Sequence, residues 1–272
     1  MPTTCALQKS YATVSNALPI RRVMGVPVHA ITMSKVIDIV ENAISCREQL
    51  QIGVVNAAKV LNMKKDALLR ADVLGSDLIL ADGMSVVWAS RLLRQSLPER
   101  VPGIDLMHEI LRRGEQRGWR IFCLGATDEV LRRVKEKISE QYPGVKVVGT
   151  RNGYFQEAEE VEVAREISES RPDVIFIAIT SPKKERFLGR WSKQLGVPVT
   201  HGVGGSFDVM AGKVKRAPIL WQRFGCEWAY RLKQEPRRLW KRYLTTNTEF
   251  CLLLAKEMLH QTLNSRQSVT NV

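Results

Sequence analysis

Short, mostly apolar segments recur through most of the chain, and helical patterns separate them. Six of them have the length and apolar content of buried strands: residues 52–56, 77–81, 119–124, 145–149, 173–179 and 197–203. Between them, apolar residues recur at helical spacing, as at Val130, Val134 and Ile138, which are four apart. Apolar strands that alternate with amphipathic helices are typical of a parallel sheet covered on both faces. The sequence therefore predicts an α/β fold with a Rossmann-like, mostly parallel sheet.

The pattern changes near both ends of the chain. The N-terminal residues show no periodicity, and after Pro218 aromatic and basic residues replace the apolar strands. We expect a flexible N-terminal tail, an α/β core, a basic aromatic helical appendage, and a C-terminal helix with a tail: residues 1–22, 23–212, 213–245 and 246–272.

The C-terminal appendage, residues 213–245, concentrates the positive charge. Between Lys213 and Arg242, ten lysines and arginines stand against two acids, a net charge of +8 out of +13 for the whole chain. A local excess of this kind predicts a surface that docks anions. A charge run is by default a solvated face, but three of the six tryptophans lie among these cations. That mixture favours an interface with lipid headgroups or a stacked nucleic-acid surface.

Helical spacing is visible within the appendage. Trp221, Phe224, Trp228 and Leu232 form one stripe of a single predicted helix, and Pro236 is placed to begin a second.

The five cysteines and four histidines stand apart, with no C-x-x-C or H-E-x-x-H spacing. An odd cysteine count without such motifs predicts a reducing compartment, and neither a metal nor a cofactor is expected. The N-terminus has no apolar signal segment, and no stretch approaches the roughly 18 apolar residues of a spanning helix. These features predict a cytoplasmic protein that can still lie on a membrane surface.

Polar residues and glycines follow the predicted strands. Ligands of open parallel sheets bind beyond the C-terminal ends of the strands, so these residues are expected to share one rim. The rim comprises Asn56, Asp82, Gly125, Thr180-Ser181, Gly204 and Gly205.

Several of these residues allow two interpretations. Asp82 can be a general base or the N-cap of the next helix. Gly204 and Gly205 can bring backbone amides close to a phosphate or sugar, although a plain tight turn is the commoner case. Asp208, just after them, can accept ribose hydroxyls or cap a helix.

Three further side chains can touch a ligand. Arg100, in a loop, can hold a diphosphate or be solvated. Lys184 can neutralise phosphate or be an ordinary surface charge of a first helical turn. Tyr154 can stack on a base or be a half-buried loop aromatic. Because the chain has no D-x-D pair, any departing diphosphate would need arginines and backbone amides to stabilise it.

Eight motifs occur in an order that resembles the WecG/TagA/CpsF family of glycosyltransferases, over residues 24–244. They are Ala81-Asp82-Gly83, Arg100-Val101-Pro102-Gly103-Ile104-Asp105, Leu124-Gly125-Ala126, Gly202-Val203-Gly204-Gly205-Ser206-Phe207-Asp208, Ala211-Gly212, Lys215-Arg216-Ala217-Pro218, Glu227-Trp228-Ala229-Tyr230-Arg231-Leu232 and Glu235-Pro236-Arg237-Arg238.

The resemblance implies an inverting transfer from a UDP-sugar to a sugar on a polyprenyl diphosphate, at the cytoplasmic face of the membrane. Such enzymes build exopolysaccharide, capsule or other surface polymers. The resemblance also implies that the protein binds an anionic membrane surface and does not bind nucleic acid. It does not decide whether the chain forms a homo-oligomer.

The resemblance also assigns roles to individual residues. Asp82 matches the proposed base, Asn56 an active-site asparagine, and Arg100 an arginine near the substrate. The remaining positions imply substrate contacts: Tyr154 and Asp208 to uridine, Gly125, Lys184, Gly204 and Gly205 along the rim, and Arg231, Arg238 and Lys241 from the appendage.

Two positions depart from the family pattern. Val54 stands where the family commonly has a threonine, and Lys184 replaces a glutamine amide by a cation. Both positions should lie near the sugar. They favour a donor or acceptor of different polarity from N-acetylmannosamine, such as glucose or a hexuronic acid.

Overall fold

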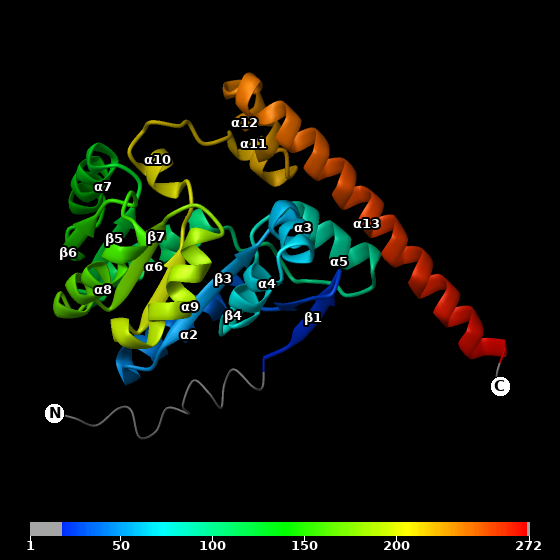
Figure 1. Ribbon diagram of the computed structural model, residues 1–272, viewed down its shortest axis with the longest axis horizontal. Coiled ribbons are helices and arrows are strands. Elements are labelled where there is room, and N and C mark those ends of the chain that lie inside the picture. Colours follow the sequence, from blue (N-terminus) through cyan, green and yellow to red (C-terminus); the bar gives the residue numbers. More distant parts are fainter. Residues whose placement is uncertain (1–17, 271–272) are drawn as a thin grey trace.

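The computed structural model describes residues 18–270, with side chains through residue 261. Its centre is a six-stranded parallel sheet in the order β4-β3-β8-β7-β5-β6 (Figure 1). The strands are β3 (Leu50–Val55), β4 (Leu78–Ala81), β5 (Arg120–Gly125), β6 (Lys146–Arg151), β7 (Val174–Ala178) and β8 (Val199–Gly202). Each predicted apolar segment overlaps one of these strands, so the predicted α/β fold is confirmed.

Helices cover both faces of the sheet. The first face carries α2 (Met33–Cys46), α6 (Gly103–Arg117) and α7 (Asp128–Gln141). The second carries α3 (Ala57–Lys65), α4 (Ala67–Leu74), α5 (Met84–Leu92), α8 (Glu160–Glu169) and α9 (Lys183–Leu195), with a short 3-10 turn η2 (Glu157–Glu159) before α8.

The central strands are apolar on both sides because both sides are covered. In β5, Ile121 and Cys123 pack into the cluster under α2, α6 and α7, whereas Phe122 and Leu124 pack under α8 and α9. All four are fully buried. Burying a side chain the size of Phe122 stabilises the fold by about 1.5–3 kcal/mol, so the rim of this sheet is a firm support for a site.

An antiparallel hairpin, β1 (Ile20–Val23) and β2 (Val26–His29), lies beside β4. Met24 and Gly25 both have positive φ, as a two-residue hairpin turn of matching twist requires. The predicted tail of residues 1–22 is therefore wrong from Ile20 onward, because these residues pair with β2. Residues 1–17 lie outside the described residues.

The appendage forms two short helices, α11 (Ile219–Arg223) and α12 (Glu227–Gln234), before the long helix α13 (Pro236–Thr270). The single predicted helix through Trp221 and Leu232 is wrong, because Gly225, at φ 63°, breaks it. A Cβ at Gly225 would lie 2.6 Å from the Cβ of Met84 in α5, so the chain turns where it approaches the core.

Helix α13 begins at Pro236, as predicted, and continues across the expected boundary at residue 245. Its middle packs on the core through Phe250, and its far end extends away from the sheet (Figure 1). Within residues 18–270, no helix combines the length and the apolar content that crossing a bilayer requires.

Candidate active site

Asp82 directly follows β4 and is fixed by two hydrogen bonds from other elements. Its Oδ2 accepts from the side-chain amide of Asn56 at 3.3 Å, and its Oδ1 accepts from the backbone N–H of Gly103 at 2.9 Å. The next helix, α5, has Gly83 as its N-cap and no side-chain capping bond. The N-cap interpretation of Asp82 is therefore wrong. Its carboxylate instead joins the ends of β3 and β4 to the start of α6.

Asn56 links this carboxylate to helix α3. It is the N-cap of α3, and its Oδ1 accepts from the backbone N–H of Lys59 at 3.1 Å while its amide points to Asp82. One side chain thus orients the carboxylate and the first turn of a helix together. A carboxylate held in this way is positioned for proton transfer to or from a bound group.

A buried group of charges occupies the middle of the rim. Glu185 accepts through Oε1 from Lys59 at 2.6 Å, and Lys184 lies 3.3 Å from the same oxygen. The interpretation of Lys184 as a surface charge is wrong, because only 10% of its side chain is exposed. Burial lowers the pKa of Lys184 to about 8, aided by the charge of Lys59 and opposed by Glu185. We call these three residues the lysine–glutamate triad.

Both lysines hold the Glu185 carboxylate ionised. Burial alone would raise the pKa of Glu185, but the ammonium groups of Lys184 and Lys59 outweigh it and lower the pKa to about 2. The triad joins α9 to α3 across the end of β8, and it therefore fixes the two helices whose first turns border the rim.

His201, at the end of β8, is fully buried beneath this rim. Burial lowers its pKa to about 4, so the ring is neutral near pH 7. Its Nε2 lies 2.9 Å from the carbonyl oxygen of Gly103, whose N–H donates to Asp82. A neutral ring can donate this bond through Nε2–H, and it thereby supports the peptide that orients the carboxylate.

Tyr154 projects from a tightly held loop after β6. Its side chain is 78% exposed, so the half-buried interpretation is wrong. The Lys183 ammonium donates to the carbonyl oxygens of Gly153, at 3.1 Å, and of Phe155, and it lies 4.0 Å from the Phe155 ring centroid. An exposed aromatic ring on a loop fixed from both sides is a stacking platform for a planar ligand.

Gly125 allows this loop to approach the sheet. It has φ 118°, and a Cβ there would lie 2.5 Å from the carbonyl of Ala178 in β7. Gly153 packs on it in turn, with its own ideal Cβ 3.0 Å from the Cα of Gly125. Glycine is required here for close packing, which brings the Tyr154 loop to the ends of β5 and β7.

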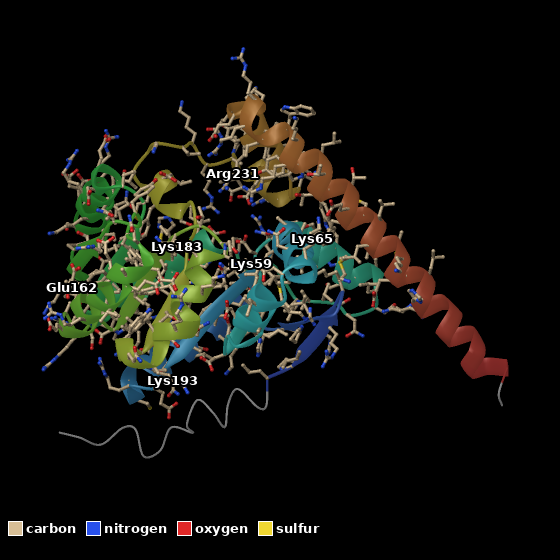
Figure 2. The ribbon with its side chains drawn as sticks, viewed as in Figure 1. Lys59, Lys65, Glu162, Lys183, Lys193 and Arg231 are labelled. Atoms are coloured by element: carbon tan, nitrogen blue, oxygen red, sulfur yellow. The ribbon has the colours of Figure 1, made fainter. Side chains whose placement is uncertain are left out.

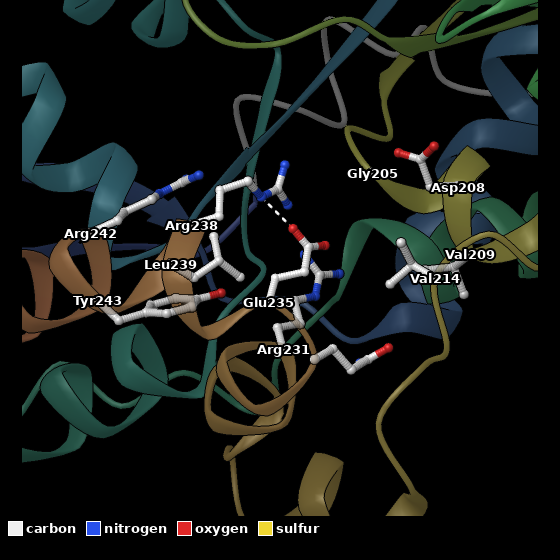
Figure 3. Close-up of a pocket in the computed structure, with 11 residues that line it drawn as sticks. Gly205, Asp208, Val209, Val214, Arg231, Glu235, Arg238, Leu239, Arg242 and Tyr243 are labelled. Atoms are coloured by element: carbon white, nitrogen blue, oxygen red, sulfur yellow. Dashed lines mark ion pairs between the residues drawn. The ribbon is translucent and has the colours of Figure 1, made fainter.

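A cleft of about 140 Å³ lies between the core and the appendage (Figure 3). Helix α10 (Ser206–Met210) forms one wall, and α12 and α13 form the other. Its lining includes the predicted residues Gly205, Asp208, Arg231 and Arg238. Two acids and three arginines give the lining a net positive charge, so it is suited to an anion.

The glycine-rich turn stands at the edge of this cleft. Gly204 has φ 53°, and neither Gly204 nor Gly205 has an atom within 4 Å of an added Cβ. The backbone is therefore open to a ligand at both positions. Asp208 lies inside α10, not at its N-cap, and its carboxylate is 3.8 Å from Lys213.

Arg100 is not solvated. Its Nη1 donates to Glu227 of α12 at 2.9 Å, with 15% of the arginine side chain exposed. Arg216 lies 2.5 Å from Asp105 of α6 and 3.9 Å from the same Glu227. Two ion pairs thus join the appendage to the core, Glu227 with Arg100 and Arg216 with Asp105, and Glu227 also lies near Arg216 within the appendage.

Figure 2 shows Lys59 and Lys183 at the edge of the core that faces the appendage, with Arg231 on the appendage side. Lys241 is not brought into the cleft. Its ammonium lies 5.6 Å over the Trp240 ring, and the neighbouring Arg242 lines the cleft instead.

Sequence reasoning assigned no role to several residues that the structure places at the rim or in the cleft: Lys59, Glu185, His201, Glu227, Arg242 and Tyr243. The charge run contained Arg242, so its cleft position could have been inferred from helical spacing with Arg238. No local signal pairs Lys59 with Glu185.

In the part of the chain with described side chains, no three His, Cys, Asp or Glu residues come together as metal ligands. The prediction that no metal or cofactor is used stays a prediction.

A fixed carboxylate, an exposed aromatic ring and an arginine-lined cleft at the carboxyl rim of a parallel sheet form the kind of site at which α/β enzymes bind an anionic ligand. The chain belongs to the "Glycosyl transferase WecG/TagA/CpsF family", whose model matches residues 21–264. The predicted family is therefore confirmed, and the protein is a glycosyltransferase.

Two relatives carry the name N-acetylglucosaminyldiphosphoundecaprenol N-acetyl-beta-D-mannosaminyltransferase. The one from Bacillus subtilis (strain 168) is 40% identical over 187 residues, 68% of this chain and 72% of the relative. The one from Bacillus spizizenii (strain ATCC 23059 / NRRL B-14472 / W23) is 38% identical over 170 residues, 62% of this chain and 65% of the relative. The similarity thus spans about two thirds of each relative's length.

Proposed function

We propose that this protein moves a hexose-type sugar from a UDP-sugar to a glycan on a polyprenyl diphosphate, with inversion at the anomeric carbon. The product would serve the synthesis of a surface polymer such as an exopolysaccharide or capsule. The observation that carries the proposal is the geometry of Asp82, a carboxylate fixed by Asn56 and Gly103 at the rim.

In this mechanism Asp82 removes the proton from an acceptor hydroxyl, and the oxygen attacks the anomeric carbon on the face opposite the UDP. The bond to the diphosphate breaks as the new glycosidic bond forms, which inverts the centre. Arg231, Arg238 and Arg242 line the cleft in which the departing diphosphate would be stabilised. Arg100 would join them when Glu227 yields it.

The donor's uracil would stack on Tyr154, and Asp208 would accept ribose hydroxyls. Support comes from the exposure of the Tyr154 ring and from the position of Asp208 on the cleft wall. The names of the relatives support the acceptor class, because both describe transfer to a sugar on diphosphoundecaprenol.

We also propose that the protein works on the cytoplasmic face of the membrane, held there by the appendage. Ile219, Leu220 and Phe224 of α11 and its C-cap are each about two thirds exposed, among basic residues. Apolar side chains flanked by cations suit an anionic bilayer surface. A polyprenyl-linked acceptor would be reached from that surface.

The proposal is tested by replacing Asp82 with asparagine, which keeps the size and loses the base. Transfer from a UDP-sugar panel to a prenyl-diphosphate glycan should fall by about 10²–10⁴-fold, the usual contribution of a positioned base. UDP affinity should stay within about twofold, because Asp82 contacts the acceptor and not the nucleotide.

Asp38→Asn on α2, an exposed residue that neither lines the cleft nor contacts Asp82, is the control and should keep full activity. Full activity of Asp82→Asn would show that the base is assigned wrongly. Displacement of UDP by RNA would favour a nucleic-acid binder instead.

A further inference from the structure

A cationic surface of the core, outside the cleft, has no acidic partners. Four arginines are exposed there on β1 and α5: Arg21, Arg22, Arg91 and Arg94, the last just after α5 ends. The two elements pack beside each other, at the end of the sheet away from β6 (Figure 1). Neither element contains Asp or Glu. Among the residues with described side chains, none of the four arginines has an acid as an ion-pair partner.

This lack of partners sets the four arginines apart. Exposed arginines on α6, α7 and α8 are paired with glutamates of their own helices: Arg112 with Glu109, Arg132 with Glu136, and Arg165 with Glu162. The chain ends do not supply the missing acids, because residues 1–17 and 262–272 contain no Asp or Glu. Unbalanced charges of one sign attract a partner of the opposite sign. The surface of β1 and α5 is therefore complementary to an anionic partner.

Apolar side chains lie among these arginines. Trp88 and Leu92, one turn apart on α5, are 44% and 55% exposed, and Ile20 of β1 is 46% exposed. Arg91 follows Trp88 by three residues, so it shares that side of the helix. Guanidinium groups that reach phosphates while apolar bodies enter the acyl boundary are suited to a bilayer surface. A nucleic acid is a poorer match, because leucine and isoleucine offer no flat face on which a base can stack.

The same surface continues onto α11 and begins beside the active site. Gly225, after α11, lies against α5, where an added Cβ would be 3.0 Å from the Trp88 ring. Its neighbour Phe224 is 69% exposed and belongs to the proposed membrane surface of the appendage. Helix α5 itself starts at Met84, just after Asp82. A bilayer that contacts α11 would therefore reach α5, and with it the rim of the sheet.

We infer that β1 and α5 form a second membrane contact, which belongs to the core and binds an anionic bilayer. The four arginines would pair with lipid phosphates, and Ile20, Trp88 and Leu92 would lie at the level of the headgroups. This inference rests on the proposed membrane role and goes beyond it, because the bilayer would hold the core directly and not only through the appendage. Contact along α5 would keep Asp82 close to the lipid surface from which a prenyl-linked acceptor is reached.

The test measures sedimentation of the full chain with vesicles of phosphatidylglycerol and phosphatidylcholine. Arg22→Gln combined with Arg91→Gln removes one arginine from each element. The partition coefficient should fall by about fivefold for each arginine removed, the contribution of one cation near an anionic bilayer. Leu92→Ser, which leaves the charge unchanged, should lower the partition coefficient several-fold through the lost apolar contact. Both variants should fold, since all three side chains are exposed.

The matched control is Arg132→Gln combined with Arg133→Gln on α7, which packs against β6 at the other end of the sheet. It removes the same charge, but from arginines that are paired with glutamates. Its partition coefficient should stay within about twofold of that of the unchanged protein, because charges remote from the bilayer are screened by salt.

A partition coefficient of Arg22→Gln with Arg91→Gln equal to that of the control would overturn the inference and leave the proposed function intact. An arginine effect without a Leu92→Ser effect would also overturn it, by assigning the surface to a soluble anion. If the unchanged protein does not sediment with anionic vesicles, the proposed membrane role fails, and the inference with it.

Discussion

The two sides of the cleft are held in place by different forces. On the core side, Asp82 is fixed by Asn56 and a backbone N–H at the ends of fully buried strands. On the appendage side, α11 and α12 contain no buried residue, and Glu227 contacts Arg100 and Arg216 through ion pairs. Packing therefore fixes the side that would do the chemistry, whereas the appendage buries only Ala217 and Leu239 among its apolar residues and depends more on partly exposed ion pairs.

This difference suits an enzyme that must admit a charged substrate and then enclose it. Ion pairs can exchange partners with a diphosphate, whereas a packed core cannot shift without losing contacts. Arg100 illustrates the exchange, because its ion-pair partner Glu227 belongs to the appendage. The comparison predicts that mutations on the two sides will fail in different ways.

The largest effect is expected on the core side, from Gly125→Ala. The new Cβ would meet the Ala178 carbonyl at 2.5 Å, at a φ of 118° that L-residues rarely adopt. Overpacking and backbone strain together should lower the free energy of unfolding by about 3 kcal/mol or more. Urea unfolding followed by tryptophan fluorescence measures this change.

Gly205→Ala, on the cleft wall, is the control. It has φ −76° and nothing within 4 Å of an added Cβ, so the free energy of unfolding should change by no more than about 0.5 kcal/mol. If Gly125→Ala and Gly205→Ala have the same free energy of unfolding, close packing does not fix the rim.

The same division separates what the sequence could predict from what it could not. The strand β7 was predicted from its continuous apolar run, a local consequence of burial on both faces. The hairpin strand β1 was missed because its sequence, Ile-Arg-Arg-Val, has no apolar run and only Val23 is buried. Its pairing with β2 depends on the turn at Met24 and Gly25, which propensity alone does not reveal.

For the site, the rim was predictable and the triad was not. Asp82 and Asn56 follow strands, so the rule for parallel sheets placed them together, and a 3.3 Å contact joins them. Lys59 and Glu185 are 126 residues apart, and no local pattern pairs them. The break at Gly225 was missed for the same reason, since its cause is the approach of α5.

An intermediate effect is expected at the joint between the two sides, from Glu227→Gln. The glutamine keeps a hydrogen bond but loses the charge that pairs with Arg100 and Arg216. The contact between the appendage and the core should weaken by about 1–2 kcal/mol, the difference between a charge-assisted and a neutral hydrogen bond. Trypsin should therefore cut the lysine- and arginine-rich appendage about tenfold faster, while urea unfolding of the core stays nearly unchanged.

The matched control is Glu249→Gln, which removes a more exposed ion pair between α13 and Lys65 of α3. Such pairs contribute about 0–1 kcal/mol, so trypsin cleavage should stay close to that of the unchanged protein. If Glu227→Gln is cleaved no faster than this control, the ion pair between Arg100 and Glu227 does not hold the appendage.

The smallest effect is expected on the outer surface of the appendage, from Ile219→Ser combined with Phe224→Ser. Both side chains are more than 60% exposed, so their loss should leave folding and UDP affinity unchanged. If they insert into the bilayer surface, sedimentation with anionic liposomes should fall several-fold, because part of about 1.5–3 kcal/mol per side chain is lost. Leu68→Ser on α4, equally exposed but on the core, is the control. A double variant that sediments as well as the control would leave the basic residues alone to hold the membrane, and added salt would then release it completely.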